Sequence, residues 1–194
     1  MAIATEIVID EAQLNGLLAQ LKGLKTSASK LMVGAINDTL KAGKSQLARD
    51  VVSRINIKSK SFKKRIKVER ASIATMFGKL RLKEYAPPNI ASYGAIPKQP
   101  EKKNRRGLSY KVFKGGPRIR VKDAFMAKAR HGAIIAFRRE GKARYPITPV
   151  LGPSVNEIIK QQKIDEYTLS FMREKLPDRI RGRLFVALKS EGLV

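Results

Sequence analysis

The hydrophobic residues of this chain recur with a helical period towards both ends and with a period of two in the middle. β-Branched residues predict a short strand at 3–9, and leucines at helical spacing predict a helix over Glu11–Leu24. A longer helix is predicted from a cap at Thr26 or Ser27 to about Arg54. Its apolar stripe mixes small and large side chains, which suits close packing on a sheet: Leu31, Ala35, Ile36, Leu40, Leu47 and Val51.

The middle of the chain alternates between apolar and polar residues, after a short helix predicted over Phe62–Arg65. Alternation of this kind is typical of half-buried strands. Because these strands follow one another without helices between them, they favour an antiparallel or mixed sheet. The prediction is a central sheet of five to six strands, drawn from residues 66–70, 76–85, 108–113, 119–121, 133–138 and 143–150.

Residues 86–107 interrupt this alternation. They begin with Pro87 and Pro88 and end in a run of basic residues between Lys102 and Gly107. We interpret the segment as a long, mobile, basic loop that joins two strands.

Helical periodicity returns after Gly152. Ser154 is a suitable N-cap with Glu157 three residues later, which together form a capping-box pattern. The helix that follows is predicted to reach about Lys175, and Pro177 is expected to break it or to begin another. Helices, then strands, then helices define the α+β class, and we expect a single domain over residues 1–194.

The charge is concentrated in the middle of the chain. Between Arg54 and Arg144 there are 27 Lys/Arg and five acids, a net charge of +22 out of +25 for the whole protein. An ordinary solvated surface would balance its bases with acids, and this segment does not. A polyanion is therefore the expected partner, either nucleic acid or a strongly acidic protein surface.

Candidate catalytic chemistry is sparse, and an enzyme is not expected. The one histidine, His131, lies in a predicted turn, and the five acids of the middle are scattered. Zero cysteines exclude disulfides and thiolate zinc sites, and no phosphate-binding or dinucleotide motif is present. We predict no cofactor, no metal and no membrane association, since no signal peptide or apolar run of membrane length is evident.

Contact with nucleic acid is expected to be directed to the backbone and not to the bases. No zinc-finger, homeodomain or RNA-recognition signature appears, and only Tyr85, Tyr93 and Tyr110 could stack on bases. One hypothesis is therefore a free, sequence-nonspecific nucleic-acid-binding protein. The residues predicted to contact DNA or an acidic partner are Lys63, Lys64, Arg65, Lys102, Lys103, Arg105 and Arg106.

The stretch Phe125–Ser154 resembles the minor tail protein Z family of lambda-like phages and prophages. The upstream pairs Ile36-Asn37 and Arg65-Ile66 also fit this family, and the resemblance covers roughly residues 30–190. We expect its motif residues to be mainly structural, with Gly141 in a hairpin turn and Pro146 restraining the next strand. The motif residues are Gly141, Lys142, Arg144, Pro146, Gly152, Pro153 and Ser154.

The resemblance implies a structural protein of a long-tailed phage or prophage, and this is the favoured hypothesis. Such a protein would act at the head-proximal end of the tail, in tail completion and head–tail joining. It would form a homo-oligomeric ring, with a hexamer as the expected state, in contact with neighbouring neck and tail proteins. DNA would pass through its lumen. It would be found in the virion, and in the host cytoplasm during assembly.

Overall fold

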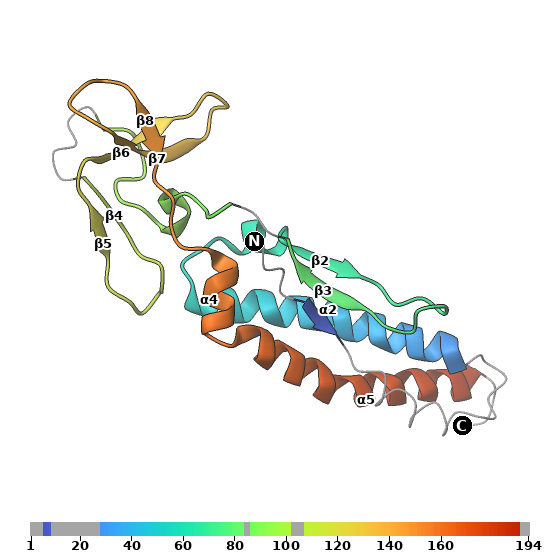
Figure 1. Cartoon of the computed structure of the whole chain (residues 1–194). Helices are drawn as coiled ribbons and strands as arrows, with labels where there is room; N and C mark the ends of the chain where they lie inside the picture. Colours follow the sequence, from blue (N-terminus) through green and yellow to red (C-terminus); the bar gives the residue numbers. More distant parts are fainter. Residues whose placement is uncertain (1–5, 9–27, 84–85, 102–106, 191–194) are drawn as a thin grey trace. The chain divides into compact units, whose positions relative to one another are not determined.

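The computed structural model describes residues 6–8, 28–83, 86–101 and 107–190 (Figure 1). Its contacts divide the chain into two compact units. Unit one contains Met1–Ala48, Lys63–Glu84 and Lys160–Val194, and unit two contains Arg49–Phe62 and Tyr85–Ile159. The predicted helix at 11–24 lies outside the described residues, and the expectation of a single domain stays a prediction.

Unit one combines two long helices with a small antiparallel sheet. The helices are α2 (Ala28–Arg54), of which the residues to Ala48 belong to this unit, and α5 (Ile164–Ser190). The sheet has the order β1-β3-β2. Its strands are β1 (Glu6–Val8), β2 (Ile66–Glu69) and β3 (Lys79–Leu82).

Two glycines on α2 allow α5 to approach closely. A β-carbon at Gly34 would overlap the guanidinium of Arg183, and one at Gly43 would overlap the sulfur of Met172. Residue numbers fall along α5 as they rise along α2, so the two helices run antiparallel (Figure 1). Nε and Nη2 of Arg183 both donate to Oδ2 of Asp38 at 2.8 Å, which links the same two helices.

The other side of the α2 stripe packs on the sheet, as its mixture of small and large residues predicts. Leu80 of β3 lies 3.3 Å from where a β-carbon of Gly43 would stand, and Leu40 lies against Gly78. Asn37 adds a polar link. Its Nδ2 donates to the carbonyl of Ala71 at 3.1 Å, and its Oδ1 accepts from the amide of Ala71 at 2.9 Å.

Unit two is built from two further antiparallel sheets and short helices. One sheet pairs β4 (Leu108–Tyr110) with β5 (Ile119–Val121), and the other has the order β6-β7-β8. The strands of the second are β6 (Ala124–Lys128), β7 (Ile134–Arg139) and β8 (Ile147–Pro149). The short helices are the 3-10 helix η1 (Ile90–Tyr93), α3 (Ser59–Lys63) and α4 (Val155–Gln161), the last two ending in residues of unit one.

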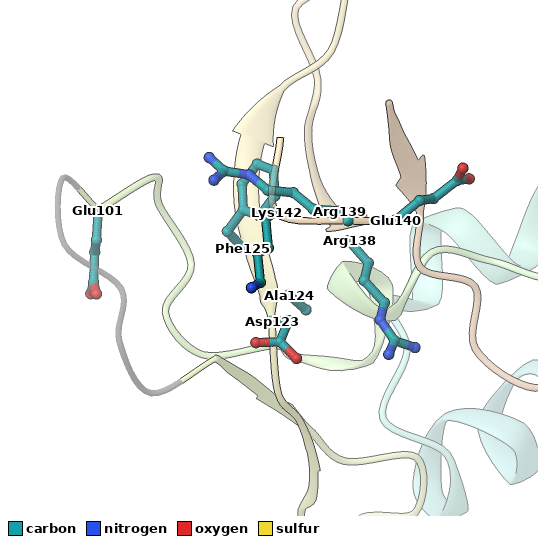
Figure 2. A pocket seen from close by; sticks show the side chains of 9 residues that line it. Glu101, Asp123, Ala124, Phe125, Arg138, Arg139, Glu140 and Lys142 are labelled. Atoms are coloured by element: carbon teal, nitrogen blue, oxygen red, sulfur yellow. The ribbon is translucent and has the colours of Figure 1, made fainter. Parts of the chain in front are cut away.

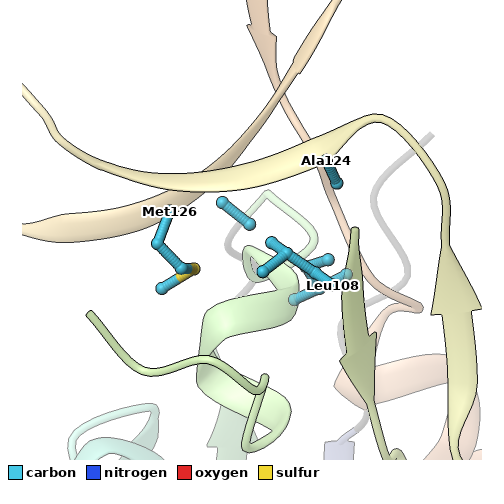
Figure 3. Close-up of a cluster of buried hydrophobic side chains, with 5 residues drawn as sticks. Leu108, Ala124 and Met126 are labelled. Carbon is cyan, nitrogen blue, oxygen red and sulfur yellow. The ribbon is translucent and has the colours of Figure 1, made fainter. Parts of the chain in front are cut away.

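The core of unit two lies between these two sheets and η1 (Figure 3). Ala124 and Met126 point from β6 towards Leu108 of β4. All members of this cluster are aliphatic or Met, although Tyr93 and Phe62 are buried elsewhere in the unit. The members of the cluster are Ile90, Leu108, Ala124, Met126 and Ala136.

Asn89 joins η1 to the central strand of the β6-β7-β8 sheet. Its Nδ2 donates to the carbonyl of Ala136 at 2.8 Å, and its Oδ1 accepts from the amide of Ala136 at 2.9 Å. The same oxygen accepts from the amide of Ala91 at 3.0 Å and so caps η1. One side chain therefore satisfies three backbone groups, two of them on the fully buried Ala136.

Asn56 makes a similar link elsewhere in unit two. Its Nδ2 donates to the carbonyls of Tyr93 at 3.0 Å and Lys111 at 3.1 Å. Gly94, which ends η1 at φ 66°, passes so close that a β-carbon there would lie 2.6 Å from this nitrogen. Both the left-handed backbone and the close approach favour glycine at this position.

The predicted α+β class with antiparallel strands is confirmed, but the strands form three small sheets and not one central sheet. Strand β6 was not predicted, because residues 124–127 form an apolar run without alternation. The segment at 86–101 is not a loop throughout. Ile90, Tyr93 and Ala95 are buried, and Ile96 forms an antiparallel bridge with Ser109 of β4.

The predicted break at Pro177 is also wrong. Pro177 lies inside α5, and the chain instead breaks at Lys163, whose φ is 51°. Pro177 has no backbone N–H, so the carbonyl of Arg173, four residues earlier, lacks its helical donor. Because Arg173 is exposed, water can satisfy that carbonyl and the helix continues.

We expect Asn89→Ala to lower the free energy of unfolding of unit two by about 1–3 kcal/mol, because it leaves the buried backbone amide of Ala136 without its acceptor, whereas the Ala136 carbonyl still accepts from the amide of Val150. Chemical denaturation of the full chain, followed by circular dichroism, measures this change. The control is Gln99→Ala, at an exposed position of the same unit, which should change stability by less than about 0.5 kcal/mol. Equal stability of the two variants would contradict the role assigned to Asn89.

Candidate nucleic-acid interface

A basic hairpin, residues 107–122, is the most one-sidedly charged segment that the structure describes in unit two. It contains five Lys/Arg and no acid. The hairpin consists of β4, β5 and their connection, which turns at residues 113–116 and so includes the predicted turn glycines Gly115 and Gly116. Its basic residues are Lys111, Lys114, Arg118, Arg120 and Lys122.

Strand pairing assigns the hairpin two different faces. Leu108 pairs with Val121, and Tyr110 pairs with Ile119, so these apolar residues share one face. Leu108, Tyr110 and Val121 contact the core, whereas Ile119 is exposed. Ser109 pairs with Arg120, and both therefore lie on the opposite face. The hairpin is thus amphipathic, with its cations on the side away from the core.

Arg118 shapes this outer face. Its Nε donates to Oγ of Ser109 at 3.1 Å, and its Nη2 donates to the carbonyls of Ser109 at 2.8 Å and Gly94 at 2.9 Å. Three bonds to the protein make Arg118 a structural residue. Lys114 and Lys122 are exposed, and no acid of the described residues pairs with either ammonium group. They can therefore approach phosphate oxygens without first losing a partner.

The residues predicted from sequence lie elsewhere. Lys63 and Lys64 are exposed at the end of α3, and the Arg65 carbonyl accepts from the amide of Lys83 at 2.7 Å. All three belong to unit one, whereas the basic hairpin belongs to unit two. The remaining four, Lys102, Lys103, Arg105 and Arg106, lie outside the described residues.

Two further cations of unit one, Lys67 and Arg81, are less suited to contact phosphate because each lies beside a carboxylate. Lys67 Nζ lies 3.3 Å from Oε1 of Glu69, and Arg81 Nε lies 3.5 Å from Oε2 of the same carboxylate. These two cations of the β2–β3 pair therefore share a counter-charge. Lys63 and Lys64 have no such acidic partner among the described residues, so both remain candidates for contact with a polyanion.

The tyrosines considered for base stacking do not fit that role. Tyr93 is fully buried, and its hydroxyl donates to the carbonyl of Pro153 at 2.7 Å. Tyr110 is half-buried against the core, and Tyr85 lies outside the described residues. His131 is exposed in the β6–β7 turn, as predicted, where the amide of Ala129 donates to the carbonyl of Ala133.

An open pocket of about 640 Å³ lies at one end of the β6-β7-β8 sheet (Figure 2). Arg138 and Arg139 point to opposite sides of β7, as adjacent strand residues must. The guanidinium of Arg139 lies 5.3 Å from the centre of the Phe125 ring. The lining mixes both charge signs: Glu101, Asp123, Arg138, Arg139, Glu140 and Lys142, with Ala124, Phe125 and Gly141. Such a lining suits polar contacts with a partner.

The family-motif residues have two kinds of role. Gly152 lies against the Tyr93 ring and donates its amide to the carbonyl of Pro88 at 2.8 Å, while Pro153 accepts from Tyr93. These contacts fix the chain just before α4. The Ser154 carbonyl accepts from the amide of Ile158, which starts that helix, and the capping box with Glu157 stays a prediction.

The second part of the motif, the β7–β8 loop, is exposed. The amide of Glu140 donates to the carbonyl of Pro146 at 3.3 Å and closes the loop directly before β8. Gly141 has neither a left-handed backbone nor an atom near its missing β-carbon, so its backbone does not require glycine. Gly141 and Lys142 instead line the pocket, and Arg144 lies 5.8 Å from the Tyr145 ring centre.

The described residues contain no group of three or more His, Cys, Asp or Glu side chains placed to hold a metal ion. Within the same ranges, none of the helices has the length and apolar character needed to cross a bilayer.

The chain is a structural protein of phage tails. It belongs to the prophage minor tail protein Z (GPZ) family, whose model matches residues 14–190. No curated protein and no solved structure matches it. As a tail protein it is a component of the virion and contacts other tail proteins.

We expect Gly152→Ala to lower the free energy of unfolding by about 1–3 kcal/mol, because a β-carbon would lie 2.6 Å from Cε2 of the buried Tyr93 ring. Thermal unfolding measures the effect. Gly141→Ala is the matched control within the same motif, since open space surrounds its β-carbon position. A Gly141→Ala variant as unstable as Gly152→Ala would refute this division of the motif.

Proposed function

We propose that this tail protein acts at the head-proximal end of the tail, in tail completion and head–tail joining, as an oligomeric ring around the DNA path. A hexamer is the expected state. Membership of the minor tail protein Z family supports the general setting. The observation that carries the finer assignment is the charge of +22 between Arg54 and Arg144, in a chain of net charge +25.

A cationic ring suits DNA that passes through without being read. Phosphate contacts position a protein on DNA but carry no sequence information. The β4–β5 strand pair carries cations that can contact phosphates. Tyr93 is fully buried and therefore cannot stack on a base. Contact of this kind would bind DNA and release it with little dependence on sequence, as passage through a tail requires.

The basic hairpin is the proposed DNA-contacting surface of unit two. Lys63, Lys64 and Arg65 are the proposed contact residues of unit one. Residues two apart on a strand are about 6.6–6.8 Å apart, which is close to twice the 3.4 Å axial rise per phosphate of one DNA strand. Arg120 and Lys122 have this sequence spacing. The proposed contact residues at 102, 103, 105 and 106 lead directly into the hairpin along the chain.

Replacing Lys111, Lys114 and Lys122 together by Gln should weaken binding to duplex DNA and flatten its salt dependence. Each lost phosphate contact lowers the slope of log K against log salt by about 0.9, so three lost contacts lower it by about 2.7. The matched control changes Lys30, Lys41 and Lys44 on α2 to Gln, which removes the same charge from the nearly neutral N-terminal part. Equal slopes for the two triple variants would exclude the hairpin as the contact surface.

Mass photometry of the same samples, at low and high salt and with and without DNA, tests the oligomeric part of the proposal. Discrete ring-sized species, or assembly triggered by tail components, would support it. A monomer that coats DNA at low salt and leaves it at high salt would instead favour the free nucleic-acid-binding protein.

Tails assembled with Lys102, Lys103, Arg105 and Arg106 changed to Ser should join heads poorly or fail to deliver DNA, since four of the proposed contact cations are removed. Complementation of a phage that lacks this protein, scored by plaque titre and by counting joined particles, measures the defect. The same test applies to Lys63, Lys64 and Arg65. Normal titres would remove these residues from the contact surface.

A further inference from the structure

The β6-β7-β8 sheet has a second face, turned away from the core of unit two. Alternation assigns Ala124, Met126 and Ala136 to the core face, and all three are buried. Their neighbours along the strands must point the other way. We call this the outer sheet face, and its residues are Phe125, Ala127, Ile135, Phe137, Arg139, Ile147 and Pro149.

Register and ring contacts show that the outer sheet face is continuous. Phe125 pairs with Phe137, and the centres of their rings are 6.4 Å apart. Phe137 also pairs with Pro149, and Arg139 pairs with Ile147. Arg139 lies over the Phe125 ring. The face therefore runs across all three strands as one apolar surface with a single cation on it.

This face is apolar although it is not part of the unit's core. The core cluster, with the residues packed against it, contains none of its members. Phe125, Ile135, Phe137 and Ile147 are half-buried, whereas a solvated sheet face normally carries polar residues in these places. A sheet with apolar residues on both faces is expected to be covered on both.

The surroundings of the face are basic. Residues 122–150 contain seven Lys/Arg and two acids. Arg139 lies on the face itself, and exposed Lys142 and Arg144 lie in the loop at one end, beside the pocket. At the other end, Arg130 is exposed in the β6–β7 turn. The face thus has the layout of a protein interface, an apolar aromatic centre with a charged rim.

We propose that the outer sheet face binds an acidic surface of a different virion protein, and that the pocket at its end receives polar groups of that partner. Charge complementarity selects this partner. A second copy seated on the same face would bring two Arg139 side chains and two basic rims together. DNA would leave the aromatic centre unused, because protein–DNA contacts are largely polar and directed to phosphates.

This assignment separates two surfaces of unit two. The basic hairpin, with exposed lysines on its outer face, is the surface for phosphates, whereas the outer sheet face is the surface for a protein. The inference deepens the proposed function, since it rests on the chain acting among other virion proteins. By strand geometry the face is only about 20 Å long and three strands wide, so it forms the centre of the interface and the basic loops form the rim.

Photo-crosslinking in assembled particles tests the proposal. p-Benzoylphenylalanine replaces Phe137 in the full chain, the variant complements a phage that lacks the protein, and adducts are mapped by mass spectrometry after irradiation. The expected adduct joins residue 137 to a segment of a different virion protein in which acids outnumber bases. The same probe at Tyr167, an exposed position of α5 in unit one, is the positional control and should not produce this adduct.

A second variant measures the contribution of the apolar centre. Phe137→Ser should lower incorporation of the protein into particles by about tenfold or more, because aromatic residues at the centre of an interface dominate its affinity. Ile73→Ser, which removes an exposed apolar side chain from unit one, should leave incorporation unchanged. Circular dichroism of both purified variants checks that they are folded.

Three outcomes would overturn the inference: an adduct to another copy of this chain, an adduct to DNA, or no adduct at all from residue 137. The two proposals fail separately. Loss of the adduct in particles that still join heads and deliver DNA would reject the acidic partner and leave the proposed function intact. The opposite result is an unchanged salt slope for DNA binding by the variant with Lys111, Lys114 and Lys122 changed to Gln, together with a normal adduct in particles that contain it. That result would reject the DNA contact of the hairpin and leave the acidic partner in place.

Discussion

Side-chain amides of asparagine bond to backbone groups outside the regular strand ladders, and the arrangement of short elements depends on them. A fold of two- and three-stranded sheets leaves many strand edges and loops without regular partners. Asn89 pairs with both backbone groups of Ala136, Asn37 pairs with both of Ala71, and Asn56 bridges Tyr93 and Lys111. In each case one side-chain amide bonds two backbone groups and so fixes the separation between segments that are distant in sequence. The carbonyls of Ala136 and Tyr93 accept a backbone amide as well, so there the asparagine adds to the backbone pairing.

The elements predictable from sequence were those with a strong local period. The helix to Arg54 and the strands at 66–69 and 119–121 appear where their patterns indicate. The α+β class follows from their order. Local pattern could not show that the strands divide into three sheets, because strand pairing joins residues far apart in the chain. It also missed the buried Ile90 and Tyr93, which sit among prolines and polar residues in a segment that reads as a loop.

The candidate surfaces were predictable only in part. Charge concentration pointed to the middle of the chain, and Lys63 and Lys64 are indeed exposed. The sequence could not show that Arg118 is bound to Ser109 and Gly94, or that β4 and β5 direct their cations to one side. Neither could it identify the outer sheet face, because β6 carries no alternation. Phe125 and Phe137 become partners only through strand register.

The contact between Gly152 and Tyr93 has a consequence for how sequences in this family can vary. The ring occupies the space of a β-carbon at 152, and its hydroxyl holds the carbonyl of the next residue. A larger residue at 152 is therefore tolerable only with a smaller one at 93, and a smaller residue at 93 would leave a cavity unless 152 also changed. The two positions should be inherited as a pair. The recognisable glycine of the motif is one half of that pair, and the other half is a tyrosine 59 positions earlier in a stretch that carries no motif of its own.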